Sequence, residues 1–442
     1  MFLTHTSKIR GLSKLEYSML REMCRYSNNL YNVALYSIRQ YFFREKQFLS
    51  YTRNYHECKT NENYGLLQAG VAQQILKITD RSFKSFFNLI KKAKTGSYSF
   101  KDIKIPHYRE KGGMFNLILS TNAINIKNGF LFVPMSHEFS SIHENAQIKI
   151  PFPERLKDKN IKEVRIIPVH NGRFFKIQYC YKQSIEDLKL NKSNILSIDI
   201  GLDNLASCVT TIGTSFIMDG RKLKSINHHW NKRKAHLQAI AMRQGQHTTK
   251  LIQNITLKRN NRVDDYIKKV ARYIVNYCIL HDIGTVICGY NFNFKRKIDL
   301  GKKNSQNFVQ ISLGNLRQSL AGLCERYSMQ YFEQEESYTS RASFLDLDST
   351  PVYNPKQPFG GDFSGKRIKR GLYRFSNNQF ANADINGAAN ILRKSKQNFD
   401  YERLCKGLLA SPLRIREPFK VETQIQTSHN NSLPLSIGSM SK

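Results

Sequence analysis

Two acidic residues that lie far apart in the chain have neighbours typical of a metal-dependent phosphodiesterase. Asp199 lies in the segment Leu196-Ser-Ile-Asp-Ile, which is mostly apolar and is followed by Gly201. This pattern predicts a buried strand that carries an acid to a glycine turn. Asp384 stands near the start of a predicted helix of small residues, Asn382-Ala-Asp-Ile-Asn-Gly-Ala-Ala-Asn-Ile391. Carboxylate oxygens are the ligands that Mg²⁺ prefers, and two such ions can activate a water and stabilise the leaving oxygen of a phosphodiester. The two motifs therefore indicate metal-dependent cleavage of nucleic acid.

Each acid also has a purely structural interpretation. Asp199 could cap the turn that contains Gly201, and Asp384 could stabilise the N-terminus of its helix through the helix dipole. However, an isolated ionised Asp within a doubly buried strand would be costly. The order and separation of the two motifs favour the joint, catalytic interpretation.

The third carboxylate of a two-metal site has two candidates. In an RNase H-like fold it is expected at the end of the fourth strand, where this chain has Gly289. The fifth strand of that fold lies beside the fourth and parallel to it, about 4.8 Å away. A glutamate at its end could reach the same ions through the space that Gly289 leaves empty. Glu335 is slightly favoured over Glu336, although the sequence does not separate them, and both could instead be surface acids.

The elements around these motifs follow the order of an RNase H-like domain. Three antiparallel strands come first and alternating helices and strands follow. The predicted strands span 195–200, 205–211, 214–218, 285–291 and 329–335, and the predicted helices lie within 221–281, 308–326 and 381–393. The nuclease domain is predicted over 194–395, with a cysteine-free insert at 341–378. Residues 396–442 are predicted to be a polar tail, disordered at its end.

The N-terminal half predicts a different architecture. Residues 14–100 show helical spacing of apolar residues, whereas 101–187 contain short strands with hairpin turns at Asn128-Gly129 and Asn171-Gly172. We expect residues 1–13 to join these strands in an antiparallel barrel or sandwich, which makes 14–100 a helical insertion. The predicted fold class is therefore α+β and multidomain: a β-barrel with a helical insertion, followed by an RNase H-like α/β nuclease domain.

Charge and cysteine content narrow the functional class. The chain has 442 residues, with 69 Lys and Arg against 34 Asp and Glu, and this excess predicts a polyanionic partner. A membrane surface is the competing partner, but no apolar run approaches the ~20 residues of a spanning helix and no signal peptide is evident. We expect a cytoplasmic protein associated with the bacterial nucleoid. The eight cysteines are scattered without a C-x-x-C pair, which favours apolar packing roles in a reducing interior.

Two basic segments are candidate nucleic-acid-binding regions. The first is the aromatic and basic stretch at the end of the first helical run, and the second is part of the cysteine-free insert. The candidate residues are Arg39, Arg44 and Lys46 in the first, and Lys366, Arg367, Lys369 and Arg370 in the second. For each single residue, a solvated surface charge is the alternative.

The motifs together resemble the TnpB family, the OrfB-type proteins of insertion sequences, which are related to type V CRISPR effectors and to Fanzor proteins. The segments that carry the resemblance are Leu12-Ser-Lys-Leu-Glu-Tyr, Asn29-Leu-Tyr-Asn-Val-Ala-Leu-Tyr, Val71-Ala-Gln-Gln-Ile-Leu, Asp199-Ile-Gly-Leu-Asp-Asn, Asn304-Ser-Gln-Asn-Phe-Val-Gln, Glu335-Glu-Ser-Tyr-Thr-Ser, Phe363-Ser-Gly-Lys-Arg-Ile-Lys-Arg-Gly-Leu-Tyr and Asn382-Ala-Asp-Ile-Asn-Gly.

The resemblance implies a wedge barrel, a helical recognition insertion and a RuvC nuclease domain. It implies an endonuclease that uses a guide RNA from the transposon end to cut double-stranded DNA beside a short flanking motif. Two Mg²⁺ ions would be the cofactor, Asp199 would match the first RuvC aspartate, and Asp384 would match the last.

The chain departs from the family pattern in two ways. The strand-four glutamate is replaced by Gly289, and a branch of the family uses a displaced glutamate, which would fit Glu335 or Glu336. The insert lacks the cysteines of a zinc ribbon, so no structural zinc is expected, and its lysines and arginines would bind phosphate instead. Two alternatives stay open: a nuclease-dead, RNA-guided repressor, and a guide-independent resolvase or transposase. The oligomeric state is also open.

Overall fold

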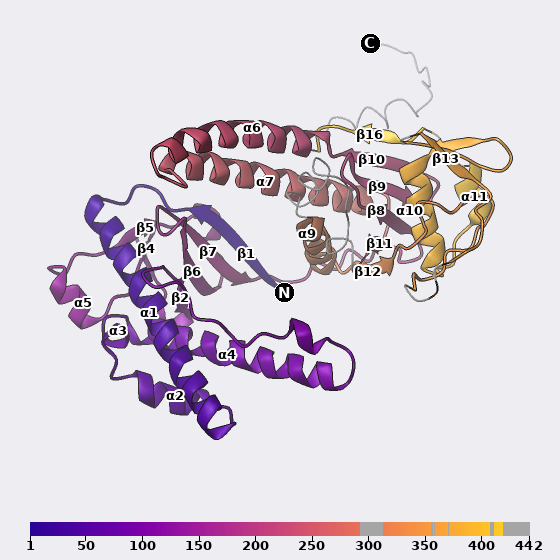
Figure 1. Ribbon diagram of the computed structural model, residues 1–442. Helices are drawn as coiled ribbons and strands as arrows, with labels where there is room; N and C mark the ends of the chain where they lie inside the picture. The colour runs from indigo at the N-terminus through magenta and orange to yellow at the C-terminus, as the bar shows by residue number, and fades with distance from the viewer. Residues whose placement is uncertain (292–312, 355–356, 358, 370, 407–410, 419–442) are drawn as a thin grey trace, which may run out of the picture. The chain divides into compact units, whose positions relative to one another are not determined.

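The chain folds into two compact units, Met1–Ser184 and Ile185–Lys442. The computed structural model describes residues 1–291, 313–354, 357, 359–369, 371–406 and 411–418 (Figure 1). Throughout those ranges, no helix combines the length and the apolar character that crossing a bilayer requires.

Two antiparallel sheets organise the first unit. The larger has the order β1 (Phe2–Lys8), β7 (Phe174–Lys182), β6 (Ile161–Val169), β2 (Leu117–Ser120), and the smaller the order β3 (Asn125–Lys127), β4 (Phe130–Phe132), β5 (Lys149–Pro151). β1 pairs with β7 along its whole length, so the prediction that the N-terminus joins these strands is confirmed. Both predicted Asn-Gly turns adopt positive φ angles.

The strands predicted to form a barrel or sandwich form two open sheets around one core. No ladder between the two sheets is found among the described residues. A closed barrel needs a continuous, staggered ladder, and the strands of the smaller sheet are only three residues long. Side chains from both sheets nevertheless meet in the same core, for example Leu119 and Ile177 of the larger and Leu131 of the smaller.

The helices predicted within 14–100 are present as α1 (Lys14–Glu45), α2 (Tyr51–Cys58), α3 (Glu62–Gly65) and α4 (Ala69–Lys94). α1 begins with a capping box, in which the Ser13 hydroxyl accepts from the Glu16 N–H and the Glu16 carboxylate accepts from the Ser13 N–H. Its buried stripe includes Met19, Met23 and Leu30. Another helix, α5 (His137–Ile142), lies between the strands of the smaller sheet in sequence.

A six-stranded sheet forms the centre of the second unit. Its order is β12 (Gln330–Glu335), β11 (Thr285–Tyr290), β8 (Ile195–Asp199), β9 (Asn204–Thr210), β10 (Ser215–Asp219), β16 (Leu413–Ile415). β8, β9 and β10 run antiparallel, whereas β11 is parallel to β8 and β12 is parallel to β11. The prediction that strand five lies beside strand four and parallel to it is confirmed.

Both faces of this sheet are covered, which explains the nearly continuous apolar character of β8 and β9. Leu196 and Ile198 of β8 pack in one core with α7 (Lys250–Leu280) and α9 (Leu313–Arg326). Ile195 packs in a second core with α10 (Ala383–Lys394). Figure 1 shows α10 beside the strands, and α6 (Arg221–Arg243) paired with α7. The first residues of the predicted helix 308–326, and the motif at 304–310, lie outside the described residues.

The predicted polar tail is corrected in its first part. It contains α11 (Tyr401–Lys406) and β16, and β16 extends the sheet by pairing parallel to β10. Burial of Ile415 in the core with α7 anchors this strand, which is too short to show periodicity in the sequence. The predicted disorder at the chain end concerns residues 419–442, which lie outside the described residues. The cysteine-free insert contributes β13 (Lys366–Lys369) and β14 (Leu372–Arg374) to a sheet with β15 (Phe380–Asn382).

Candidate active site

Asp199 is the last residue of β8 and lies against α10. The Ser197 hydroxyl, two residues earlier, donates to the Ala388 carbonyl of that helix. Gly387 permits the close approach, because a Cβ atom there would lie 2.8 Å from Oδ2 of Asp199. The small residues of α10 therefore bring the helix directly onto the Asp199 carboxylate.

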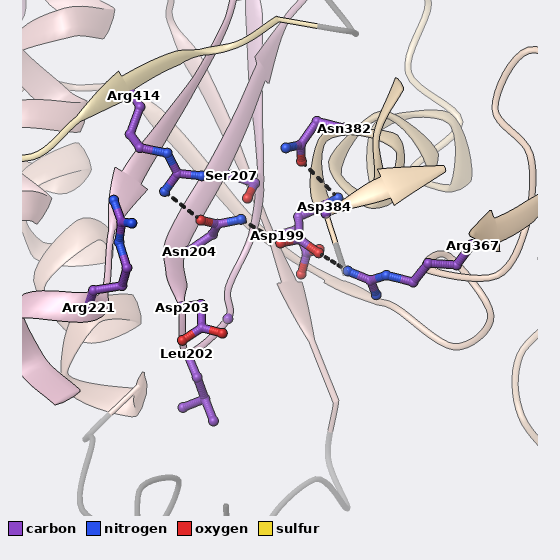
Figure 2. Close-up of a pocket in the computed structure, with 12 residues that line it drawn as sticks. Asp199, Leu202, Asp203, Asn204, Ser207, Arg221, Arg367, Asn382, Asp384 and Arg414 are labelled. Atoms are coloured by element: carbon purple, nitrogen blue, oxygen red, sulfur yellow. Dashed lines mark hydrogen bonds and ion pairs between the residues drawn. The ribbon is translucent and has the colours of Figure 1, made fainter. Parts of the chain in front are cut away.

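Asp384 lies in the first turn of α10 and is held from two sides (Figure 2). Asn382 caps the helix, and its side-chain oxygen accepts from the Asp384 N–H. Oδ2 of Asp384 accepts from Nδ2 of Asn204 at 2.6 Å, and Oδ1 accepts from Nη2 of Arg367 at 2.7 Å. Asp199 and Asp384 line the same cavity of about 690 Å³, so the structure brings the two sequence-predicted acids together.

The cavity contains both signs of charge. Its acids are Asp199, Asp203 and Asp384, and its guanidinium groups belong to Arg221, Arg367 and Arg414. The carboxylates could hold a cation, and arginine forks suit phosphate oxygens. A site that cleaves a phosphodiester needs metal ligands at the scissile bond and cations for the neighbouring phosphates, and the cavity offers both.

Glu336 fills the space above Gly289. A Cβ atom on Gly289 would lie 2.5 Å from Oε2 of Glu336, so any other residue at this position would displace the carboxylate. β11 and β12 pair Gly289 with Gln334, and Glu336 follows two residues later. The room left by the missing strand-four acid is thus occupied by an acid from the end of strand five.

Glu335 faces a different partner. Its Oε2 accepts from Nζ of Lys394 at 2.6 Å, and its Oε1 accepts from the Ser337 N–H. Lys394 is only 7% exposed and also donates to the carbonyls of Ser337 and Pro351. Glu335 therefore neutralises a buried lysine, and the slight preference for it over Glu336 as third ligand is not supported by this geometry.

The pKa values of Asp199 and Glu336 are raised, whereas that of Glu335 is lowered. Burial raises the pKa of Asp199 well above its usual range, and the nearby charges of Glu336 and Asp384 raise it further. Burial, with the charge of Glu335, raises the pKa of Glu336 to about 7. Burial alone would raise the pKa of Glu335, but hydrogen bonds from Lys394 and Ser337 hold it below its ordinary value. Neighbouring acids whose pKa values are raised by burial and by one another's charge are typical of functional sites.

The donor set fits a hard divalent cation. Asp199, Asp384 and Glu336 offer only carboxylate oxygens, as Mg²⁺ prefers. Within the described ranges, no three Asp, Glu, His or Cys side chains are already gathered into a metal-binding cluster. Arg367 occupies one oxygen of Asp384. A cation that bound both aspartates would therefore compete with this guanidinium for Asp384.

The predicted nucleic-acid-binding residues of the first unit have mixed roles. Arg39 donates to the Pro106 carbonyl and lies over the Tyr108 ring, 4.9 Å from its centroid. Arg44 pairs with Glu45, and its side chain is 74% exposed. Lys46 ends α1 in the left-handed conformation and is exposed. Arg39 therefore orders a neighbouring segment, whereas the other two are surface charges.

Arg109 was not among the candidates, although it is the more unusual cation. Its Nε donates to Oδ1 of Asn28, its Nη2 donates to the Met114 carbonyl, and the guanidinium lies 4.2 Å from the Phe115 ring centroid. Among the described residues, it forms no ion pair with a carboxylate, and burial lowers its pKa. A lone Arg in a polar segment carries no sequence signal for such an environment.

Among the described residues of the cysteine-free insert, one predicted cation reaches the site. Arg367 of β13 binds Asp384, while Lys366 and Lys369 of the same strand are exposed. Arg370 lies outside the described residues. Three further residues were not predicted as part of the site: Arg414 and Asn204, which line the cavity, and Lys394, which binds the neighbouring Glu335.

The comparisons with known proteins bear on this arrangement. Residues 178–295 match the OrfB_IS605 family, described as a probable transposase. The resemblance to the TnpB family is confirmed. The TnpB-like protein ORF457 of Acidianus two-tailed virus is 23% identical over 416 residues, which cover 85% of this chain and 83% of that protein. A Cas12f1 chain, solved in complex with sgRNA and target DNA, superposes with a TM-score of 0.54 at 14% identity, covering 86% of this chain and 83% of that one. That likeness shows a shared fold.

Proposed function

We propose that this TnpB-like protein is an RNA-guided, Mg²⁺-dependent endonuclease that cuts double-stranded DNA. Its second unit would be a RuvC-type, RNase H-like nuclease domain. The observation that carries the proposal is the convergence of Asp199 and Asp384 on one cavity, with Glu336 in the space above Gly289. This is the set of carboxylates that a two-metal hydrolase needs, taken from three distant parts of the chain.

Each residue has a role in this proposal. Asp199, Glu336 and Asp384 would hold the metal, and Glu336 replaces Glu335, which was slightly favoured as the third ligand before the geometry was known. When bound, Mg²⁺ would lower the pKa of the attacking water and stabilise charge on the leaving oxygen. Arg221 and Arg367 line the same cavity and would bind the phosphates beside the scissile bond. Asn204 would keep Asp384 oriented through its hydrogen bond.

Resemblance to a solved structure and the net charge of the chain support a guide RNA and a DNA target as the partners. The Cas12f1 chain with the same fold was solved with sgRNA and target DNA, and the formal charge of +35 suits two polyanions. In such a system base pairing to the guide selects the target, and the protein reads a short flanking motif and the shape of the heteroduplex. Origin of the guide from the transposon end is part of the proposal.

The test is cleavage by the purified ribonucleoprotein. The complex would be assembled with its guide and incubated with a plasmid library that carries the matched target beside randomised flanking sequence. We expect linear product in Mg²⁺ and none in chelator or without RNA. Cutting without RNA would favour the resolvase alternative. Binding of a matched duplex without cutting would favour the nuclease-dead repressor, an alternative that the comparisons do not support.

A further inference from the structure

We infer that Arg414, from the strand that follows the last large helix, is a positioning residue for the candidate catalytic Asp384 and acts through Asn204. The inference rests on the proposed function and adds a residue to its site. Nη1 of Arg414 donates to Oδ1 of Asn204 at 2.8 Å, and Nδ2 of Asn204 donates to Oδ2 of Asp384 at 2.6 Å. Figure 2 shows this chain of two hydrogen bonds along the cavity.

The two hydrogen bonds that link Arg414, Asn204 and Asp384 have a defined direction. A guanidinium can only donate hydrogen bonds and an ionised carboxylate can only accept them. Asn204 must therefore present its carbonyl oxygen to Arg414 and its amino group to Asp384. Without Arg414, the amide could rotate and turn its oxygen toward the carboxylate, which would remove the hydrogen bond and add repulsion.

The sheet determines where Arg414 lies. β16 pairs with β10 so that Arg414 is beside Ile217, and β10 pairs with β9 so that Asp219 is beside Asn204. Asp219 is 4% exposed, and its Oδ2 lies 3.6 Å from Nη1 of Arg414. Asp219 also binds Arg221, so Arg414 is placed between a buried acid and the Asn204 amide.

The two residues that contact Asp384 differ in their exposure to solvent. Asn204 is 9% exposed and lies on a central strand, whereas the side chain of Arg367 is 41% exposed on a strand of the insert. We therefore assign Asn204 and Arg414 to orientation of Oδ2, a contact that can persist while Oδ1 changes partners. Hydrogen bonds of this kind behind a metal ligand are worth about 10–100-fold in metal affinity or activity.

The experiment compares five forms of the ribonucleoprotein with wild type. They are Arg414→Ala, Arg414→Lys, Asn204→Ala, the Arg414→Ala/Asn204→Ala double variant, and Arg416→Ala as a control. Arg416 is exposed and lies two residues further on, so its removal changes the net charge equally. Thermal melting verifies that each variant is folded. The readouts are the cleavage rate at saturating DNA, the Mg²⁺ concentration for half-maximal rate, and calorimetric titration with Mn²⁺ in the absence of DNA.

We expect Arg414→Ala to slow cleavage about tenfold and to weaken Mn²⁺ binding by a similar factor, with partial recovery in Arg414→Lys. In the Asn204→Ala background, Arg414→Ala should change either quantity by less than about twofold, because its effect passes through the amide. Equal behaviour of Arg414→Ala and Arg416→Ala would overturn the inference, as would a full tenfold loss in both backgrounds.

The outcomes separate the inference from the proposed function. If wild type does not cut but the Mn²⁺ titration still distinguishes Arg414→Ala from Arg416→Ala, the nuclease proposal fails and the positioning role stands. If wild type cuts and the two variants agree, only the positioning role fails. If wild type neither cuts nor binds Mn²⁺, both fail.

Discussion

The carboxylate cavity of the second unit and the α1 surface of the first unit use their cations in opposite ways. We define the α1 surface by Arg39, Tyr108 and Arg109. In the cavity, Arg367 binds Asp384, and next to it Lys394 binds Glu335. On the α1 surface, Arg39 and Arg109 bind carbonyls, an amide oxygen and aromatic rings. Among the described residues, neither forms an ion pair with an acid.

This difference predicts separate roles for the two regions: catalysis in the cavity and anion binding at the α1 surface. A cation that is paired with an acid adds less long-range attraction to a polyanion than a cation without an acid partner, which keeps its full positive field. The cavity holds a buried acid, Asp199, whose pKa is raised by burial and by the nearby charges of Glu336 and Asp384. The α1 surface holds cations that are oriented by carbonyls, an amide oxygen and aromatic rings, and it would attract an anion. We therefore expect variants of the two regions to affect different measurements.

The largest effect is expected for Asp199→Ala. Loss of this carboxylate should lower the cleavage rate by about 1,000-fold, roughly 4 kcal/mol of barrier, because the metal loses a ligand. Binding of guide RNA and target duplex should be unchanged or slightly tighter, since a negative charge is removed. Single-turnover cleavage and filter binding, run on the same preparation, measure the two effects. An equal loss of nucleic-acid binding in Asp199→Ala would contradict separate roles for the cavity and the α1 surface.

A stability effect of intermediate size is expected from Glu336. Its pKa in the folded protein is raised to about 7 from an ordinary value of 4.5, so the folded state binds more protons than the unfolded state between these pH values. The free energy of unfolding should therefore fall as the pH rises through this window. From pH 5 to pH 8, wild type should lose on the order of 2 kcal/mol more than Glu336→Gln.

Denaturant unfolding in chelator at the two pH values measures this difference. Added Mg²⁺ should reduce it, because a bound cation stabilises the ionised acids. Glu335→Gln is the matched control. Because the pKa of Glu335 is lowered from its ordinary value of 4.5, the stability that its ionised form contributes is lost only as the pH falls below that value. Its own titration should therefore add little to the difference between pH 5 and pH 8. Identical pH slopes for wild type and Glu336→Gln would contradict the raised pKa of the buried Glu336 carboxyl.

The smallest effect is expected on the α1 surface. Arg109→Ala should weaken binding of the guide RNA or the target duplex about tenfold and make the affinity less dependent on salt, because one phosphate contact is lost. The cleavage rate of complexes already bound should stay the same. Arg44→Ala, which removes an exposed cation paired with Glu45, should change affinity less than twofold. An unchanged salt dependence in Arg109→Ala would show that Arg109 serves only packing.

The sequence predicted the second unit well because its signals are local and strong. The apolar run before Asp199 and the small residues after Asp384 predict a doubly covered strand and a closely packed helix, and both are present. The choice between Glu335 and Glu336 depended on strand register. Ser197 contacts α10 and pairs with Ile287, and Gly289 pairs with Gln334. Because side chains alternate, Gly289 and Glu336 share the face of Asp199.

Other features could not be predicted because they depend on contacts between distant residues. Arg414 enters the site only because a three-residue strand pairs with β10, and such a strand has no periodicity to detect. Lys394 is recognisable as the partner of Glu335 only once α10 is placed beside β12. The barrel was predicted from hairpin turns, which are local, but closure of a barrel is a property of the whole set of strands.

The most direct test of the central claim is a side-by-side measurement of Mg²⁺-dependent cleavage by Glu336→Gln and Glu335→Gln ribonucleoproteins. The two substitutions are isosteric and neighbouring, so they differ only in which carboxylate is lost. We expect Glu336→Gln to cut at least about 100-fold more slowly than wild type and Glu335→Gln to retain most of the rate with a lower melting temperature. A normal rate in Glu336→Gln, or a selective loss in Glu335→Gln, would contradict the proposed site.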